Sequence, residues 1–290
     1  MLRDVSKWVK TGHGGESTLP KEEIESPDNL QYLIKYPRPN GVSWEEVTEL
    51  IAAKIGTIFG LEMMKVEIVT RNDERGCLLR NFLDEYGAKT FAEGGLLLGA
   101  HSTGYQELQN SKSKGMDLIN EGFKVLERLD IWDSIKKVYI DMLIFDILIG
   151  NQDRHPYNWQ IIYFEKDCRF SPIYDSGASL GFRFDDKKLH QIYTNSDQLN
   201  GYVRRTKVKA GVFEKITVRA HDLLEYIQIY YQSEFNNSIK KLKKFDLEQY
   251  RKEIESLDFL SVEQAKWLQV IIPHRQKMIL QWIDEEDHHE

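Results

Sequence analysis

The first apolar pattern along the chain changes from strand spacing to helix spacing. Residues 30–36 combine β-branched and aromatic side chains, which predicts a strand. Ser43 then precedes a run of apolar residues at helical intervals, with Glu46 in the capping-box position and Gly60 at the end. The side chains that recur at helical spacing are Val47, Leu50, Ile51, Lys54, Ile55 and Ile58. The pattern therefore predicts a strand followed by a helix with one inward face.

Two more strands are predicted directly after this helix. Residues 66–70 and 76–80 are rich in β-branched and apolar side chains, and the polar residues 71–75 separate them as a turn. The first 85 residues or so are thus expected to be rich in strands with a single helix.

Helical spacing dominates the remainder of the chain. Residues 115–131 and 134–149 are predicted helices, and residues 159–174 form a predicted hairpin. Residues 176–210 are polar with few periodic apolar positions, which predicts a long loop. The clearest amphipathic helices of the last eighty residues span 222–232 and 262–283.

These elements indicate an α+β fold with two lobes. Residues 1–85 would form a small sheet-containing N-lobe, and residues 86–290 a larger, mostly helical C-lobe. A chain of 290 residues without an internal repeat is long enough for two such lobes with a cleft between them.

Composition narrows the classes of protein. The net charge of −7 argues against a general nucleic-acid coat, because phosphate binding needs a basic face. Only two cysteines, Cys77 and Cys168, are present, and their spacing suggests neither a zinc ribbon nor a disulfide framework. The polar first fifteen residues do not resemble a signal peptide, and the apolar segment 139–149 is too short to span a bilayer. A cytoplasmic, membrane-independent protein is expected.

Three features of the predicted N-lobe suit phosphate binding. Glycines in residues 12–17, Gly14 and Gly15 among them, would let backbone N–H groups approach phosphate oxygens, although a flexible surface turn is the more common reason for such a run. Lys35 lies in an apolar strand, where its charge needs a partner, unless it faces solvent at a sheet edge. Glu49, beside the apolar face of the helix, is the favoured partner, and a solvated helix charge is the alternative.

Two motifs of the predicted C-lobe supply acid–base and metal-binding groups. Asp153 and Asn158 lie five residues apart on a loop that follows a buried helix, the same separation as the base and the magnesium-binding asparagine of protein kinases. Asp175 ends a strand in an Asp-Ser-Gly sequence, and the intervening hairpin would return it beside Asn158. Together with Lys35, these residues indicate ATP- and Mg²⁺-dependent phosphoryl transfer.

Two other interpretations remain open. Asp153, His155 and Asp175 could ligate the metal of a hydrolase, although their spacing fits no zinc signature and leaves Lys35 unused. The basic run at residues 240–244 could contact a partner or nucleic acid, although such runs are usually solvated helix faces.

The motifs FDILIGNQDRHPYN at residues 145–158 and PIYDSGASLG at residues 172–181 resemble the catalytic core of the HipA-like serine/threonine kinases. A weaker likeness covers roughly residues 12–280. The resemblance implies a protein-kinase-like fold, with Asp153 as the general base and with Asn158 and Asp175 as magnesium ligands. It also implies nucleotide contacts from the phosphate-binding and hinge regions, namely Gly14, Gly15, Lys35, Glu49, Asn81, Leu83, His155 and Tyr174.

The resemblance also bears on partners and on size. It implies a protein substrate such as an aminoacyl-tRNA synthetase or another translation component, and an antitoxin partner. It also implies self-phosphorylation, for which Ser6, Thr11, Ser17 and Thr18 are equal candidates. The chain would be a compact form without the extra N-terminal domain, and its glycine-rich loop fits the family pattern only in part. A nucleotide-binding regulatory module with little catalysis, and a kinase of small molecules or lipids, are the alternatives.

Overall fold

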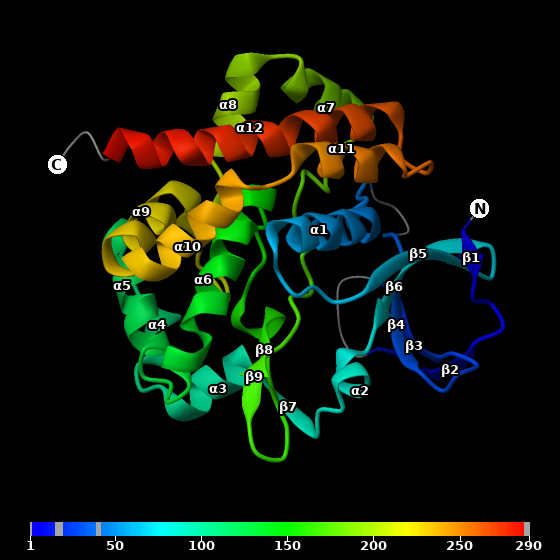
Figure 1. Cartoon of the computed structure of the whole chain (residues 1–290), viewed down its shortest axis with the longest axis horizontal. Helices are drawn as coiled ribbons and strands as arrows, with labels where there is room; N and C mark the ends of the chain where they lie inside the picture. The colour runs from blue at the N-terminus through cyan, green and yellow to red at the C-terminus, as the bar shows by residue number, and fades with distance from the viewer. Residues whose placement is uncertain (1, 15–19, 39–41, 287–290) are drawn as a thin grey trace.

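The computed structural model describes residues 2–14, 20–38 and 42–286, and Figure 1 shows a sheet on one side of the molecule and helices on the other. The sheet has six strands in the order β1-β5-β6-β4-β3-β2, and only the β1–β5 pair is parallel. Its strands are β1 Arg3–Asp4, β2 Val9–Gly12, β3 Lys21–Glu25, β4 Gln31–Lys35, β5 Val66–Arg71 and β6 Glu74–Arg80. The predicted strands at 30–36, 66–70 and 76–80 are confirmed.

Helix α1, Glu45–Phe59, packs against β5 and β6 and lies between the sheet and the other helices (Figure 1). Its predicted C-terminus is confirmed, because Gly60 ends it in a left-handed conformation with φ 85°. The predicted capping box is wrong. The cap residue is Trp44, which provides no side-chain cap; its backbone N–H instead donates to the carbonyl oxygen of Phe182 at 3.0 Å. Trp44 is 3% exposed, and the helix starts one residue later than a cap at Ser43 would place it.

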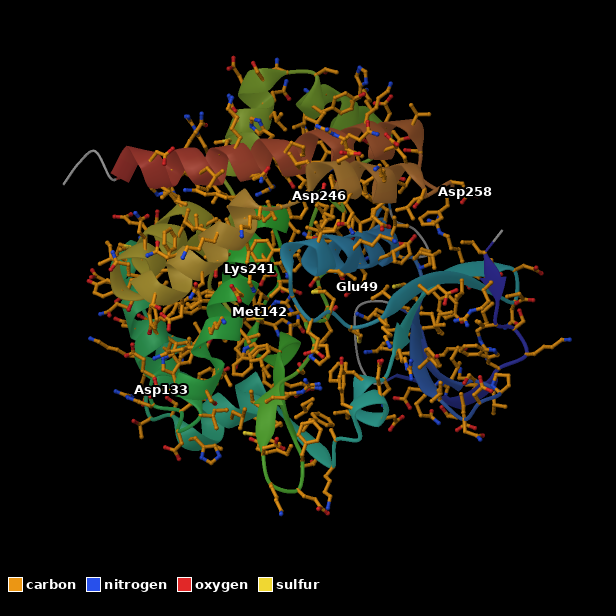
Figure 2. The ribbon with its side chains drawn as sticks, in the orientation of Figure 1. Glu49, Asp133, Met142, Lys241, Asp246 and Asp258 are labelled. Atoms are coloured by element: carbon orange, nitrogen blue, oxygen red, sulfur yellow. The ribbon has the colours of Figure 1, made fainter. Side chains whose placement is uncertain are left out.

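The helical side is built around α6, Trp132–Ile149, whose residues from Tyr139 onward are all buried. Helices α9 and α10 pack against α6, and α12 crosses it (Figure 1). In Figure 2, Lys241 of α10 lies close to Met142 of α6, and its ammonium pairs with the buried Asp141 at 2.8 Å. The helices are α2 Phe82–Tyr86, α3 Gly94–His101, α4 Tyr105–Leu108, α5 Gly115–Leu126, α9 Ala220–Tyr230, α10 Gln232–Lys243, α11 Leu247–Glu255 and α12 Val262–Glu286.

The predicted hairpin at residues 159–174 is confirmed as β8, Gln160–Tyr163, and β9, Cys168–Phe170. A third strand, β7 at Thr90–Glu93, joins it in the order β7-β8-β9. The short 3-10 helix η1, Pro156–Asn158, leads from the loop after α6 into β8. The loop after α6 therefore lies between two regular elements, helix α6 and strand β8.

The prediction of a long loop at residues 176–210 is wrong, because α7, Asp186–Tyr193, and α8, Ser196–Arg204, lie within it. Each helix begins at an Asx side chain: Asp185 accepts from the N–H of Lys188, and Asn195 from that of Gln198. Each buries only two apolar side chains, which is too few to produce a clear period. A two-stranded ribbon, β10 Lys207–Val208 and β11 Val218–Arg219, follows.

No helix in the described ranges is both long enough and apolar enough to cross a bilayer.

Candidate active site

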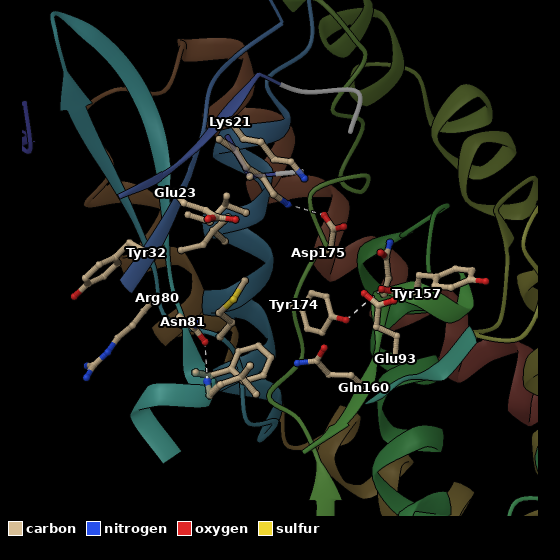
Figure 3. Close-up of a pocket in the computed structure, with 18 of the residues that line it drawn as sticks. Lys21, Glu23, Tyr32, Arg80, Asn81, Glu93, Tyr157, Gln160, Tyr174 and Asp175 are labelled. Atoms are coloured by element: carbon tan, nitrogen blue, oxygen red, sulfur yellow. Dashed lines mark hydrogen bonds and ion pairs between the residues drawn. The ribbon is translucent and has the colours of Figure 1, made fainter. Parts of the chain in front are cut away.

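A cavity of about 880 Å³ separates the six-stranded sheet from the loops that follow α6 and β9. Figure 3 shows it lined by β3, β4 and the end of β6 on one side, and by Tyr157, Gln160 and Tyr174 on the other. The residues singled out in the sequence that line it are Gly14, Lys35, Asn81, Leu83, Asp153, His155, Asn158, Tyr174 and Asp175. Glu49 lies behind the cavity wall, and Gly15 lies outside the described residues.

Lys35 and Asp175 form an ion pair across the cavity, with Lys35 Nζ 2.8 Å from Asp175 Oδ1. The ammonium is nearly enclosed, with 14% of the side chain exposed, whereas 39% of the Asp175 side chain opens into the cavity. Burial alone would raise the pKa of Asp175, but the charges of Lys35 and Arg154 outweigh it and hold that pKa below its usual value. Asp175 is therefore an ionised carboxylate with a free face toward the cavity.

Glu49 forms no ion pair with Lys35 among the described residues, although its charge helps to raise the pKa of Lys35. Its buried carboxylate accepts the backbone N–H of Ser176 at 3.1 Å and that of Gly177 at 2.7 Å. The sequence had favoured a direct pair with Lys35, but within the described residues the ion-pair partner of Lys35 is Asp175. A Cβ atom on Gly177 would lie 2.8 Å from the carbonyl oxygen of Glu45, so this close approach requires glycine. Glu49 thus fixes the backbone that carries Asp175.

The loop after α6 presents Asp153 and Asn158 to the same cavity. The amide Nδ2 of Asn158 donates to the carbonyl oxygen of Asp153 at 2.8 Å, and Asn151 Oδ1 accepts the Asp153 N–H at 3.0 Å. The Asp153 carboxylate pairs with Lys209 Nζ at 2.6 Å and remains 48% exposed. Asn158 Oδ1 accepts no hydrogen bond from the described part of the chain, so this oxygen is available to a cation.

Arg154, which the sequence reasoning missed, ties these two loops together. Its guanidinium is fully buried and donates from Nε to Asp146 Oδ2 at 2.9 Å. It also donates to the carbonyl oxygens of Asn158 and Tyr174, at 2.6 and 2.5 Å, and to Ser176 Oγ at 2.8 Å. Burial would lower the pKa of Arg154, but the adjacent Asp146 carboxylate outweighs it and raises the pKa. The sequence did contain a signal for this role. Arg154 follows a buried helix closely, and a buried arginine needs a carboxylate partner.

Residues 80–83 form the hinge region that the resemblance implies for adenine binding; they follow or end β6 and line the cavity. The N–H of Asn81 donates to the carbonyl oxygen of Gln31 at 3.0 Å, and the N–H of Leu83 donates to Asn81 Oδ1 at 2.9 Å. Asn81 is the cap of helix α2. An adenine base that accepts the Leu83 N–H would therefore take the place of Asn81 Oδ1 as the acceptor of this hydrogen bond.

His155 and Tyr174 also line the cavity. His155 Nδ1 accepts the N–H of Tyr157 at 3.2 Å, which requires an unprotonated Nδ1. Burial lowers the pKa of His155, in agreement with a neutral ring. The hydroxyl of Tyr174 donates to the carbonyl oxygen of Tyr157 at 3.2 Å, and burial raises its pKa. The Tyr174 ring lies 5.8 Å from that of Phe82 and closes the cavity wall.

Lys21 is a second ammonium at this site that the sequence reasoning missed. It lies directly opposite Lys35 in the β3–β4 register, and both line the cavity (Figure 3). Burial and the neighbouring Lys35 charge lower the pKa of Lys21. Lys21 and Lys35 thus place two ammonium groups at this end of the cavity, together with the carboxyl groups of Asp175, Glu23 and Glu45. Strand alternation could have indicated this position, because it places Lys21 and Glu23 on the same face of β3.

The donors at the site suit magnesium better than zinc. Asp175 offers a carboxylate and Asn158 an amide oxygen, both on the cavity wall, and Mg²⁺ binds few such ligands together with phosphate oxygens and water. No cluster of three or more His, Cys, Asp or Glu side chains that could hold a metal occurs in the described ranges. The interpretation as a zinc hydrolase therefore gains no support there.

Comparisons with known proteins bear on the fold and the family of the chain. A segment of 71 residues, 24% of this chain, is 34% identical to the serine/threonine-protein kinase CtkA of Helicobacter pylori and spans 22% of that protein's length. The crystal structure of the H. pylori proinflammatory kinase CtkA superposes with a TM-score of 0.78 at 17% identity, covering 97% of both chains. HipA of Shewanella oneidensis, solved with HipB and operator DNA, gives 0.51 at 12% identity over 98% of this chain and 67% of HipA. These structures confirm the two-lobed kinase-like fold.

Residues 11–227 match the sequence profile of the HipA-like C-terminal domain, which is three quarters of the chain and includes every residue of the cavity. Both motifs that carried the resemblance, at residues 145–158 and 172–181, fall within the matched range. The chain therefore belongs to the HipA-like C-terminal domain family.

Proposed function

We propose that this chain is an ATP- and magnesium-dependent serine/threonine protein kinase. The observation that supports it best is that Lys35, Asp153, Asn158 and Asp175 line one cavity, although up to 140 residues separate them in sequence. Phosphoryl transfer needs these groups, namely a cation on the phosphates, oxygen ligands for the metal and a carboxylate beside the acceptor.

The nucleotide would lie along the cavity from the hinge to the loop after β9. Adenine would occupy the end near Asn81 and Leu83, and the phosphates would meet Lys35 and Lys21. Asn158 and Asp175 would hold magnesium, which would supply positive charge against the negative charge of the phosphates. Lys35 would then exchange its present partner, Asp175, for a phosphate oxygen.

Asp153 would act as the general base. Its exposed carboxylate would accept the proton of a serine or threonine hydroxyl while the hydroxyl oxygen attacks the γ-phosphorus. The bond from this phosphorus to the β–γ bridging oxygen breaks, and ADP leaves. The acceptor becomes a phosphate ester, and Asp153 later releases its proton to solvent.

The test is transfer of labelled γ-phosphate to a generic protein substrate or to the chain itself, with Mg²⁺ and with EDTA. Asp153→Asn is expected to reduce transfer by about 10³-fold or more while ATP still binds. Asp175→Asn is expected to abolish both transfer and the magnesium dependence of ATP binding. Wild-type rates in both variants would contradict the proposal.

A second candidate is a nucleotide-binding regulatory module with little catalysis. One observation favours it: the carboxylates of Asp153 and Asp175 are both already paired with lysines. An antitoxin-like protein partner, as in the HipA structure solved with HipB, belongs to this proposal. Tight ATP binding without any labelled product would favour it over the kinase.

The nature of the acceptor is a further part of the proposal. A translation component such as an aminoacyl-tRNA synthetase, in the cytoplasm, is the substrate that family resemblance suggests, and a lipid or small molecule is the alternative. Comparison of phosphosites in cells that express wild type or Asp153→Asn would identify both the target and any self-phosphorylation.

A further inference from the structure

The ribbon formed by β10 and β11 carries an unusual arrangement of charge. Lys207 and Arg219 face each other directly in its antiparallel register, and both are exposed. Like charges placed directly opposite each other on a strand pair destabilise it. The ribbon has only two residue pairs. The second pair is Val208 with Val218, and both of these side chains are buried. One pair thus anchors the ribbon, and the other places two cations side by side in solvent.

These two cations lack an acidic partner within the described residues, where no carboxylate lies within ion-pair distance of Lys207 or Arg219. The acidic residue of the connecting segment, Glu214, is engaged elsewhere, since its carboxylate accepts the hydroxyl of Tyr105 at 2.8 Å. In a chain with a net charge of −7, this local excess of positive charge stands out.

The row of cations continues to the cavity. Lys209 directly follows β10, two residues after Lys207, and its ammonium lies 2.6 Å from the carboxylate of Asp153. We define Lys207, Lys209 and Arg219 as the cationic row. It begins at the group proposed to receive the acceptor proton and leads outward over the protein surface.

The backbone that carries this row is held firmly. Ala210 and Gly211 are both left-handed, with φ of 52° and 69°. The Gly211 N–H donates to the carbonyl oxygen of Arg154, and the hydroxyl of Tyr139 donates to that of Ala210, both at 2.7 Å. Trp159 Nε1 donates to the carbonyl oxygen of Gly211, also at 2.7 Å. The ribbon therefore keeps a fixed position relative to the loop that carries Asp153.

We propose that the cationic row is a docking surface for an acidic peptide segment, which places the neighbouring serine or threonine of a protein substrate at Asp153. This inference rests on the proposed kinase function and adds the substrate class. Asp and Glu side chains near the acceptor would meet Lys207 and Arg219, while the hydroxyl reaches the cavity. Phosphorylation would accordingly favour acceptors with acidic residues on one side.

A peptide fits this surface better than a nucleic acid does. The row is short and ends at a carboxylate, and the acidic chain as a whole would repel a long polyanion. An acidic peptide brings a few charges together with the hydroxyl that Asp153 requires.

The experiment compares three serine peptides that differ only in acidic, neutral or basic flanks, in steady-state transfer from Mg-ATP. Wild type is expected to show the lowest KM for the acidic peptide, and salt should raise that KM. In the double variant Lys207→Glu/Arg219→Glu, the KM for the acidic peptide should rise about tenfold with kcat unchanged, because each exposed charge contributes modestly. The basic peptide should improve in the same variant.

The matched control is Lys240→Glu/Lys243→Glu, which reverses two exposed cations on α10 and changes the net charge equally. Its KM values should stay at those of wild type. An unchanged KM in the ribbon variant, or an equal rise in the control, would overturn the docking surface.

Binding separates this proposal from the kinase function. The fluorescein-labelled acidic peptide is titrated into protein loaded with a non-hydrolysable ATP analogue, and anisotropy is followed. If wild type transfers no phosphate yet binds this peptide through Lys207 and Arg219, the docking surface stands and the kinase function fails. If a single-stranded RNA of equal charge binds more tightly and displaces the peptide, the docking proposal is wrong.

Discussion

Lys35 Nζ lies 2.8 Å from Asp175 Oδ1, and this ion pair joins the six-stranded sheet to the loop after β9 across 140 residues of sequence. The pair links the proposed phosphate-binding group to the proposed metal ligand. Its two sides differ, because the Lys35 ammonium is enclosed and Asp175 opens into the cavity. Loss of Asp175 would leave an enclosed ammonium without a partner, whereas loss of Lys35 would leave a partly hydrated carboxylate.

The first prediction concerns stability. Asp175→Asn should lower the free energy of unfolding by about 1–2 kcal/mol, less than for a fully buried pair, because Asp175 is partly hydrated. Lys35→Met should cost less, since the carboxylate that remains can hydrate. Urea unfolding of the two single variants and of Lys35→Met/Asp175→Asn forms a double-mutant cycle, and the double variant should lose less than the sum. Additive losses would show that the pair contributes no coupling.

Arg154 leads to a second prediction. Because its guanidinium bonds four partners in a site without solvent, Arg154→Lys should lower the free energy of unfolding by about 3 kcal/mol. An ammonium cannot span Asp146 and Ser176 at once. Phosphoryl transfer should fall together with stability, since the guanidinium no longer holds the loop after α6 against the loop after β9.

The control for this variant is Arg251→Lys, at an exposed arginine of α11. Chemical denaturation should show a change within about 0.5 kcal/mol there. A similarly small effect at position 154 would mean that the backbone alone holds the two loops.

Much of the fold followed from sequence patterns because its elements are either long or sharply bounded. The strands at 66–70 and 76–80 and the end of α1 at Gly60 were predicted, since alternation and a left-handed glycine are local signals. Helices α7 and α8 were not, because two buried apolar residues each do not establish a period. Their signal lay in the Asx caps at Asp185 and Asn195.

The sequence predicted that Asp153, Asn158 and Asp175 lie close together, and it predicted their contacts less well. Asp153, Asn158 and Asp175 were chosen for their chemistry and spacing, and the cavity contains all three. The contacts between them depend on tertiary structure: Glu49 bonds backbone N–H groups rather than Lys35, and Lys209 reaches Asp153 from a different loop. No spacing along the chain encodes such pairs.

A third prediction uses the pH dependence of stability. The pKa of His155 is lowered in the folded chain, so as pH falls below its ordinary value of 6.5 the unfolded chain binds the proton first. Stability should therefore decrease from about pH 6.5 downward. His155→Asn removes the titration and keeps an acceptor for the Tyr157 N–H. Urea unfolding at pH 7.5 and 5.5 should show a smaller loss in the variant, and equal losses would assign the effect to other groups.

The fourth prediction separates the role of Lys209 from a purely structural one. Its ammonium holds the Asp153 carboxylate at 2.6 Å, and a carboxylate free to rotate would meet the acceptor hydroxyl less often in a productive geometry. Lys209→Met should lower kcat by about 10- to 100-fold with an unchanged KM for ATP, because the nucleotide contacts lie elsewhere. Lys209→Arg should restore part of the rate, since a guanidinium can still reach the carboxylate. The melting temperature should change little in either variant, because the Asp153 side chain is 48% exposed. A higher KM for ATP with normal kcat, or an Arg variant as slow as the Met variant, would contradict this positioning role.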